Sequence, residues 1–79
     1  MARHPGEFLA ERILVPNGIS IRRAADQLGV SAPTLAEVIA GQSPMTLELA
    51  HGLAREFGHS CQFWLALQHA WEVERRLAA

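Results

Sequence analysis

The chain has 79 residues, the size of one small domain, and 49% of them are hydrophobic. Seven basic and eight acidic residues give a net charge of −1, which argues against a disordered chain and offers no strongly basic tail for nucleic acid. Cys61 is the only cysteine and every basic residue is Arg, so an internal disulfide, a zinc knuckle, lysine catalysis and P-loop chemistry are excluded.

Apolar residues recur at helical spacing along the whole chain, and no segment alternates as a strand does. We therefore expect an all-α fold of five helices. Residues 1–5 are expected to form an N-terminal arm. A first helix is predicted from Gly6 to Leu14, where Leu9 and Ile13 lie one turn apart, and it ends at the turn-forming residues 16–18.

A second helix is predicted after Ser20, which is a good N-cap residue, and before Gly29, which can end a helix. Four apolar residues within it fall at i, i+3, i+4 and i+7, and they are expected to form one buried stripe: Ile21, Ala24, Ala25 and Leu28.

A third helix is predicted between the N-cap Ser31 and Gly41, with Pro33 tolerated in its first turn. Its inner face is expected to be Leu35, Val38 and Ile39. Only Gly29 and Val30 separate the second helix from this N-cap, and a short glycine-containing turn between two amphipathic helices is typical of a helix-turn-helix. The motif is predicted at about residues 20–41.

Two more helices complete the predicted domain, which spans residues 1–79 as a single unit. Thr46 is expected to cap the fourth helix, which ends at Gly58. Ser60 is expected to cap the last helix, at about residues 60–77, with an ion pair between Glu72 and Arg76. The buried stripe of the fourth helix is predicted to be Ala50, Leu53, Ala54 and Phe57.

Residues 22–41, RRAADQLGVSAPTLAEVIAG, resemble the helix-turn-helix of lambda-repressor-like (Xre) regulators. Three flanking segments resemble a narrower group, the HigA-type antitoxins, also called VapI-like plasmid-maintenance antidotes. These segments are HPGEFLAERIL.P.GIS at 4–20, SPMTLELAHGLAREFG at 43–58 and FWLALQ at 63–68. The resemblance covers residues 4–71. It implies a homodimer that binds its own operator, represses its operon and neutralises a RelE/HigB-like mRNA-cleaving toxin. No cofactor is expected. The sequence has no signal-like or membrane-length apolar run, so a cytoplasmic location is expected.

If the inner face of the third helix is buried, its outer face is Pro33, Ala36, Glu37 and Ala40. Residues 31, 32 and 34 would then lie at the tip that enters a DNA groove first. This face offers no Arg, Asn or Gln for bidentate base contacts, and no Arg or Lys occurs between positions 24 and 54. Operator binding is therefore expected to be weak and salt-sensitive. The expected DNA-binding residues are Arg22, Arg23, Ser31, Ala32, Pro33, Thr34, Ala36 and Glu37.

The last predicted helix is apolar nearly all around its circumference at residues 63–67. Two interpretations stay open: a helix buried in the core, or a dimer or toxin interface, which aromatic residues favour. The residues in question are Phe63, Trp64, Leu67 and Trp71. The four histidines lack helical metal-ligand spacing, so no metal site is expected.

Three further functions compete with an autoregulating antitoxin. The first is a protein-binding module on a helix-turn-helix scaffold that has lost DNA affinity, which the acidic central stretch suits. The second is a stand-alone transcription regulator without a toxin. An enzyme is the third, and it is disfavoured because the sequence has no paired carboxylates, no nucleophile elbow and no glycine-rich phosphate loop.

Overall fold

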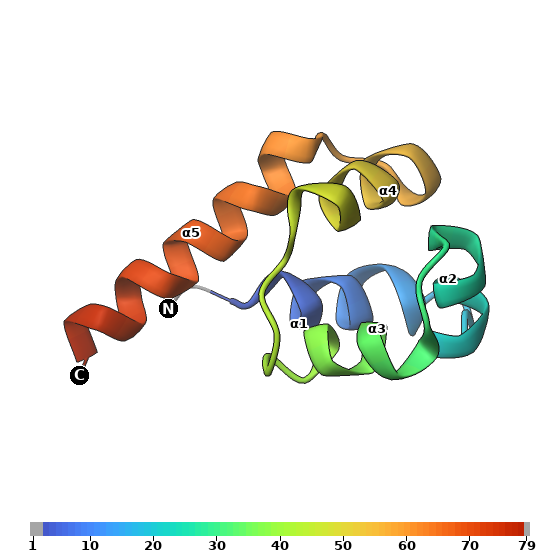
Figure 1. The fold of residues 1–79 in the computed structure, drawn as a ribbon, viewed down its shortest axis with the longest axis horizontal. Coiled ribbons are helices and arrows are strands. Elements are labelled where there is room, and N and C mark those ends of the chain that lie inside the picture. The colour runs from blue at the N-terminus through green and yellow to red at the C-terminus, as the bar shows by residue number, and fades with distance from the viewer. Residues whose placement is uncertain (1–2, 79) are drawn as a thin grey trace.

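The computed structural model describes residues 3–78, and these residues fold into helices joined by short turns (Figure 1). The elements are α1 (Pro5–Leu9), the π-helix η1 (Ala10–Leu14), α2 (Ile21–Leu28), α3 (Ala32–Ile39), α4 (Leu47–Phe57) and α5 (Cys61–Ala78). The all-α class and the five predicted helices are confirmed.

Local capping explains where four of the helices begin. In each case a side-chain hydroxyl accepts a hydrogen bond of 3.0–3.2 Å from the backbone N–H three residues later. Such a bond satisfies one of the free donors at a helix start and stabilises it by about 1 kcal/mol. The capping residues are the four that the sequence predicts: Ser20, Ser31, Thr46 and Ser60.

The N-terminal segment differs from the prediction. Met1 and Ala2 lie outside the described residues, but His4 and Pro5 are buried and are not part of an arm. The imidazole Nδ1 of His4 accepts a hydrogen bond of 3.0 Å from the N–H of Gly6, so His4 is the N-cap of α1. The predicted first helix also changes type, because η1 continues α1 with wider, π-helical turns.

The core lies where α1, α2, α3 and α4 meet the first half of α5. The predicted residues Ala24, Ala25 and Leu28 are buried there. Ile21 is not buried: its side chain is 37% exposed. It occupies the first position of α2, before the helix reaches the core. The core residues are Leu9, Leu14, Ala24, Ala25, Leu28, Leu35, Val38, Met45, Leu49, Ala50, Leu53 and Trp64.

Helix α1 lies directly against the C-terminal end of α3. Gly6 makes this possible, because a Cβ atom at this position would lie 2.6 Å from the Cα of Ile39 and still closer to the carbonyl oxygen of Val38. Both are backbone atoms, so no side-chain rotation could relieve the clash. The absence of a side chain at Gly6 therefore sets how closely α1 approaches α3.

A buried amide joins α5 to the loop between α3 and α4. The Oε1 atom of Gln68 accepts a hydrogen bond of 2.8 Å from the N–H of Met45, and its Nε2 donates to Glu72 at 2.7 Å. The predicted ion pair between Glu72 and Arg76 does not form; the salt bridges among the described residues join other side chains. Beyond this contact, the C-terminal end of α5 projects away from the other helices (Figure 1).

Candidate nucleic-acid interface

Helices α2 and α3 form the predicted helix-turn-helix. Gly29 ends α2 in the left-handed conformation, with φ of 73°, and the N–H of Val30 donates to the carbonyl of Ala25 at 3.0 Å. Ala24 and Ala25 have almost no exposed surface. Their small side chains face the core, where a larger residue would force the two helices apart.

The predicted outer face of α3 is largely open. Ser31, Pro33, Thr34 and Glu37 are exposed. Ala36 is partly covered. Ala32 is also partly buried and packs against the core, so its methyl group is less available at the tip than the sequence suggested.

The two hydroxyl groups at the start of α3 are bonded to each other. The Oγ atom of Ser31 accepts from the N–H of Thr34 at 3.2 Å and donates to the Oγ1 atom of Thr34 at 2.7 Å. The hydroxyl proton of Ser31 is therefore engaged, whereas the hydroxyl proton of Thr34 remains available. Thr34 can donate it to a phosphate oxygen or to an acceptor on a base.

Two guanidinium groups stand at the start of α2. Arg22 and Arg23 are exposed, and neither forms an ion pair with any residue that the structure describes. Cations at a helix N-terminus are disfavoured by about 0.3–1 kcal/mol each. Arg3, by contrast, forms a salt bridge with Glu11 and is already engaged within the chain.

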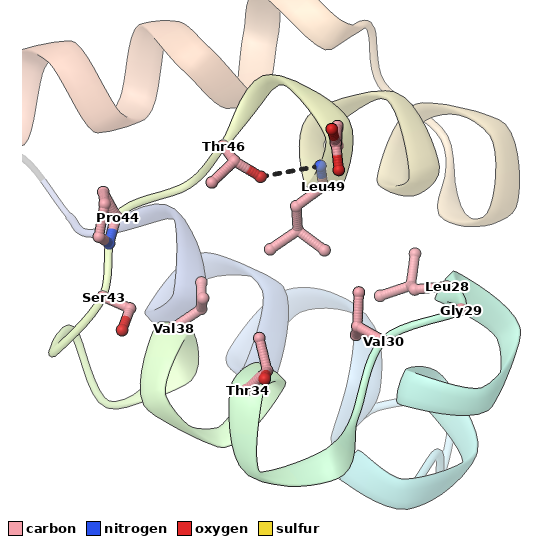
Figure 2. A pocket seen from close by; sticks show the side chains of 10 residues that line it. Leu28, Gly29, Val30, Thr34, Val38, Ser43, Pro44, Thr46 and Leu49 are labelled. Carbon is pink, nitrogen blue, oxygen red and sulfur yellow. Dashed lines mark hydrogen bonds between the residues drawn. The ribbon is translucent and has the colours of Figure 1, made fainter.

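A cavity of about 360 Å³ lies between the turn before α3, one side of α3 and the start of α4 (Figure 2). Apolar side chains from three segments reach into it, including Val30, Val38 and Leu49. This cavity separates α3 from the start of α4, so α3 is held chiefly through its contacts with α1 and α2. The position of α3 therefore depends on the close approach at Gly6 and on the crossing at Ala25.

Ser43 is a residue of this site that the sequence did not reveal. It lies in the loop after α3, and its hydroxyl donates to the Oε1 atom of Glu37 at 3.1 Å. The two residues are six positions apart. Helical periodicity does not connect residues inside a helix with residues in the following loop, so no pattern in the sequence indicated this contact.

The aromatic residues of α5 separate into two groups. Trp64 has no exposed surface, and its indole N–H donates to the carbonyl of Gly58 at 3.2 Å. The prediction that Trp64 lies at an interface is therefore wrong, because this side chain fills the core of its own chain. Phe63, Leu67 and Trp71 are partly buried, which leaves part of each side chain open to a partner.

The partly buried aromatics are also engaged within the chain. Phe63 stacks on His59 with a centroid separation of 4.2 Å, and the rings of Trp71 and His4 form an edge-to-face pair with their centroids 4.7 Å apart. The guanidinium of Arg75 lies 4.6 Å from the centre of the Trp71 ring. Of these three contacts, the one between Trp71 and His4 joins α5 to the N-terminal segment.

A separate apolar stripe runs along the open side of α5. Its members fall at i, i+4, i+7 and i+11 and all are exposed: Ala66, Ala70, Val73 and Leu77. Leu77 is 83% exposed and Val73 is 37% exposed. The helical spacing of these four residues is visible in the sequence, but the interface was predicted at the larger, mostly aromatic residues of the same helix.

The described residues contain no group of three or more His, Cys, Asp or Glu side chains placed to hold a metal ion. Cys61 is partly buried and forms no disulfide. None of the described helices is both long and apolar enough to cross a membrane.

Proteins of similar sequence are named as antitoxins, virulence-associated proteins or helix-turn-helix regulators. The chain is 38% identical over 73 residues to virulence-associated protein I of Dichelobacter nodosus, covering 92% of this chain and 68% of that protein. It is 35% identical over 74 residues to antitoxin HigA-1 of Vibrio cholerae, covering 90% and 70% respectively. No family model matches the chain.

The fold is similar to that of antitoxin HigA from Pseudomonas aeruginosa, whose structure was solved with the higBA promoter. The TM-score is 0.92 at 35% identity, and the match covers 99% of this chain and 85% of that chain. The similarity therefore extends over α1 to α5 and is not restricted to the helix-turn-helix.

Proposed function

Because this chain belongs to the HigA family of helix-turn-helix antitoxins, we propose that it binds operator DNA through α3, represses its own operon and neutralises a RelE/HigB-like mRNA-cleaving toxin. The observation that carries this proposal is the match of nearly the whole chain to an antitoxin solved with promoter DNA. The open face of α3 supports it, because a helix that enters the major groove must present one side free of its own protein.

On this proposal, affinity for DNA comes from contacts with its phosphate backbone. Arg22 and Arg23 supply the charge, and the N–H groups at the starts of α2 and α3 supply further donors. In a homodimer the arginines make about four phosphate contacts, which gives a log–log salt dependence with a slope of about −3.6. Binding is therefore weak at physiological salt and measurable at low salt.

A gel shift on the promoter of the chain's own operon, repeated at several salt concentrations, tests this role. We expect the double variant Arg22→Ala/Arg23→Ala to lose the shift. Arg55→Ala, which removes one positive charge near the end of α4, should keep both the shift and the slope. A wild-type slope indistinguishable from zero, or equal binding by the double variant, would rule out these phosphate contacts.

The proposed homodimer is formed along the apolar stripe of α5. Exposed apolar surface on a projecting helix is costly in water, and a second copy of the same stripe would cover it. We expect Val73→Glu/Leu77→Glu to be monomeric by analytical ultracentrifugation. Leu47→Glu makes the same chemical change at another exposed apolar residue, in α4, and should leave the dimer intact.

Toxin capture is tested by co-expression with any short reading frame adjacent to the gene, followed by purification through a tag on that frame. Co-purification supports the antitoxin role. A neighbour that never co-purifies while the promoter is still bound would favour a stand-alone regulator.

A second candidate is a protein-binding antitoxin with lost DNA affinity. The observation that favours it is the stretch from residue 24 to residue 54, which contains Asp26, Glu37 and Glu48 but no Arg or Lys. On this alternative the toxin co-purifies, but no promoter DNA is retained even at low salt, and replacing Arg22 and Arg23 changes neither result.

A further inference from the structure

Glu37 is the one charged side chain on the outer face of α3, and the structure holds it in place. Its Oε1 atom accepts the hydrogen bond from the hydroxyl of Ser43, at 3.1 Å. Glu37 is exposed and Ser43 is partly buried. Among the described residues no other hydrogen bond or ion pair reaches this carboxylate, so its second oxygen, Oε2, is free to accept.

The loop that carries Ser43 is fixed at both ends. At its start, Gly41 adopts a φ of 76°, and the N–H groups of Gln42 and Ser43 both donate to the carbonyl of Glu37, at 2.9 and 3.3 Å. At its end, the N–H of Met45 donates to the buried amide of Gln68 at 2.8 Å. The position of the Ser43 hydroxyl, and with it the direction of the Glu37 carboxylate, is therefore set before any ligand binds.

A carboxylate on a groove-facing helix discriminates strongly among base edges. It can only accept hydrogen bonds. In the major groove guanine and thymine present acceptors, adenine presents a donor beside an acceptor, and cytosine alone presents a donor without an acceptor. A carboxylate is therefore repelled by guanine and thymine, meets a mixed edge on adenine, and bonds well only with the N4 amino group of cytosine.

The other side chains on this face leave selection by hydrogen bonding to Glu37. Pro33, Ala36 and Ala40 have no hydrogen-bonding side chain, and Thr34 can serve donors and acceptors alike. We propose that Glu37, oriented by Ser43, is the specificity-determining residue of α3 and selects a cytosine in each operator half-site. This inference rests on the proposed operator binding.

The test is selection from a library of randomised double-stranded DNA at low salt, followed by sequencing of the retained molecules. Wild-type protein should enrich a cytosine at one position of each half-site, with about 5-fold or greater discrimination at that position. Glu37→Gln should replace cytosine with adenine there, because an amide pairs with adenine, and should leave the other positions unchanged. Ser43→Ala should keep the cytosine but lower the discrimination.

Glu48→Gln is the matched control, since it makes the same change at an exposed glutamate in the first turn of α4. It should raise affinity slightly without changing any base preference. Equal, position-independent effects of Glu37→Gln and Glu48→Gln would overturn the inference, because Glu37 would then act only as a negative charge. If wild-type protein retains no DNA at all, the operator-binding proposal itself has failed, and a toxin that still co-purifies would identify that case.

Discussion

Replacing Gly6 with alanine should separate the role of close helix packing from that of helix propensity. Gly6 lies within α1, and a Cβ atom there would be 2.6 Å from the Cα of Ile39 in α3. Gly52 lies within α4, and its added Cβ would be 3.2 Å from a methyl group of Leu28, the end of a flexible side chain. Both substitutions gain up to about 1 kcal/mol of helix propensity.

The expected magnitudes differ because the neighbours differ. At Gly6 the clash is with backbone, so α1 has to move away from α3, and overpacking of this kind typically costs about 1–3 kcal/mol. We expect the free energy of unfolding to fall by an amount near the upper end of this range, because three backbone atoms of α3 lie inside normal contact distance of the added methyl. For a domain of this size, 1 kcal/mol corresponds to about 4–8 °C in Tm. Gly52→Ala should be neutral or slightly stabilising.

Urea denaturation at one fixed protomer concentration measures both variants, because a dimer makes apparent stability depend on concentration. The fluorescence of the two tryptophans reports unfolding, since Trp64 is fully buried in the native state. Circular dichroism should give the same midpoint if unfolding is two-state. Equal stability of Gly6→Ala and Gly52→Ala would refute the contact between α1 and α3 as the structure places it.

Two further predictions concern buried polar groups. Burial lowers the pKa of His4, so below about pH 6.5 the unfolded chain binds a proton that the folded chain excludes. The free energy of unfolding should therefore fall as the pH decreases, by up to about 1.4 kcal/mol per pH unit. Urea titrations at several pH values measure this dependence. His4→Gln should flatten it, whereas the control His51→Gln, at an exposed histidine, should not. Gln68→Leu leaves the buried N–H of Met45 without its acceptor and should cost about 1–3 kcal/mol in urea denaturation, whereas the exposed Gln62→Leu should cost little.

Features determined by neighbouring residues were predictable from the sequence. A cap such as Ser31 depends only on the few residues that follow it, and the buried stripe at Ala24, Ala25 and Leu28 follows from helical geometry alone. The same periodicity assigned Ile21 wrongly. Periodicity gives the face of a helix, but it does not show where along its length the core begins.

Contacts between distant residues were not predictable in this way. Trp64 and Leu77 belong to the same helix, yet one is fully buried and the other is 83% exposed, because only the first part of α5 lies over the core. His4 was expected in an arm, but its burial depends on Trp71, which lies 67 positions later in the chain. The hydrogen bond from Ser43 to Glu37 likewise depends on a loop conformation that Gln68 fixes from α5.

On the proposed roles, affinity and discrimination come from different helices of this chain. Arg22 and Arg23 on α2 attract any DNA sequence, whereas Glu37 on α3 adds repulsion at every site that lacks a donor in the right place. A single half-site read in this way is weak, because the carboxylate contributes no attraction to phosphate. When two protomers are joined through α5, binding at the second half-site becomes an intramolecular step. The factors by which each half-site discriminates between bases are then multiplied. Loss of the dimer through Val73 and Leu77 should therefore abolish operator selection more completely than loss of either arginine alone.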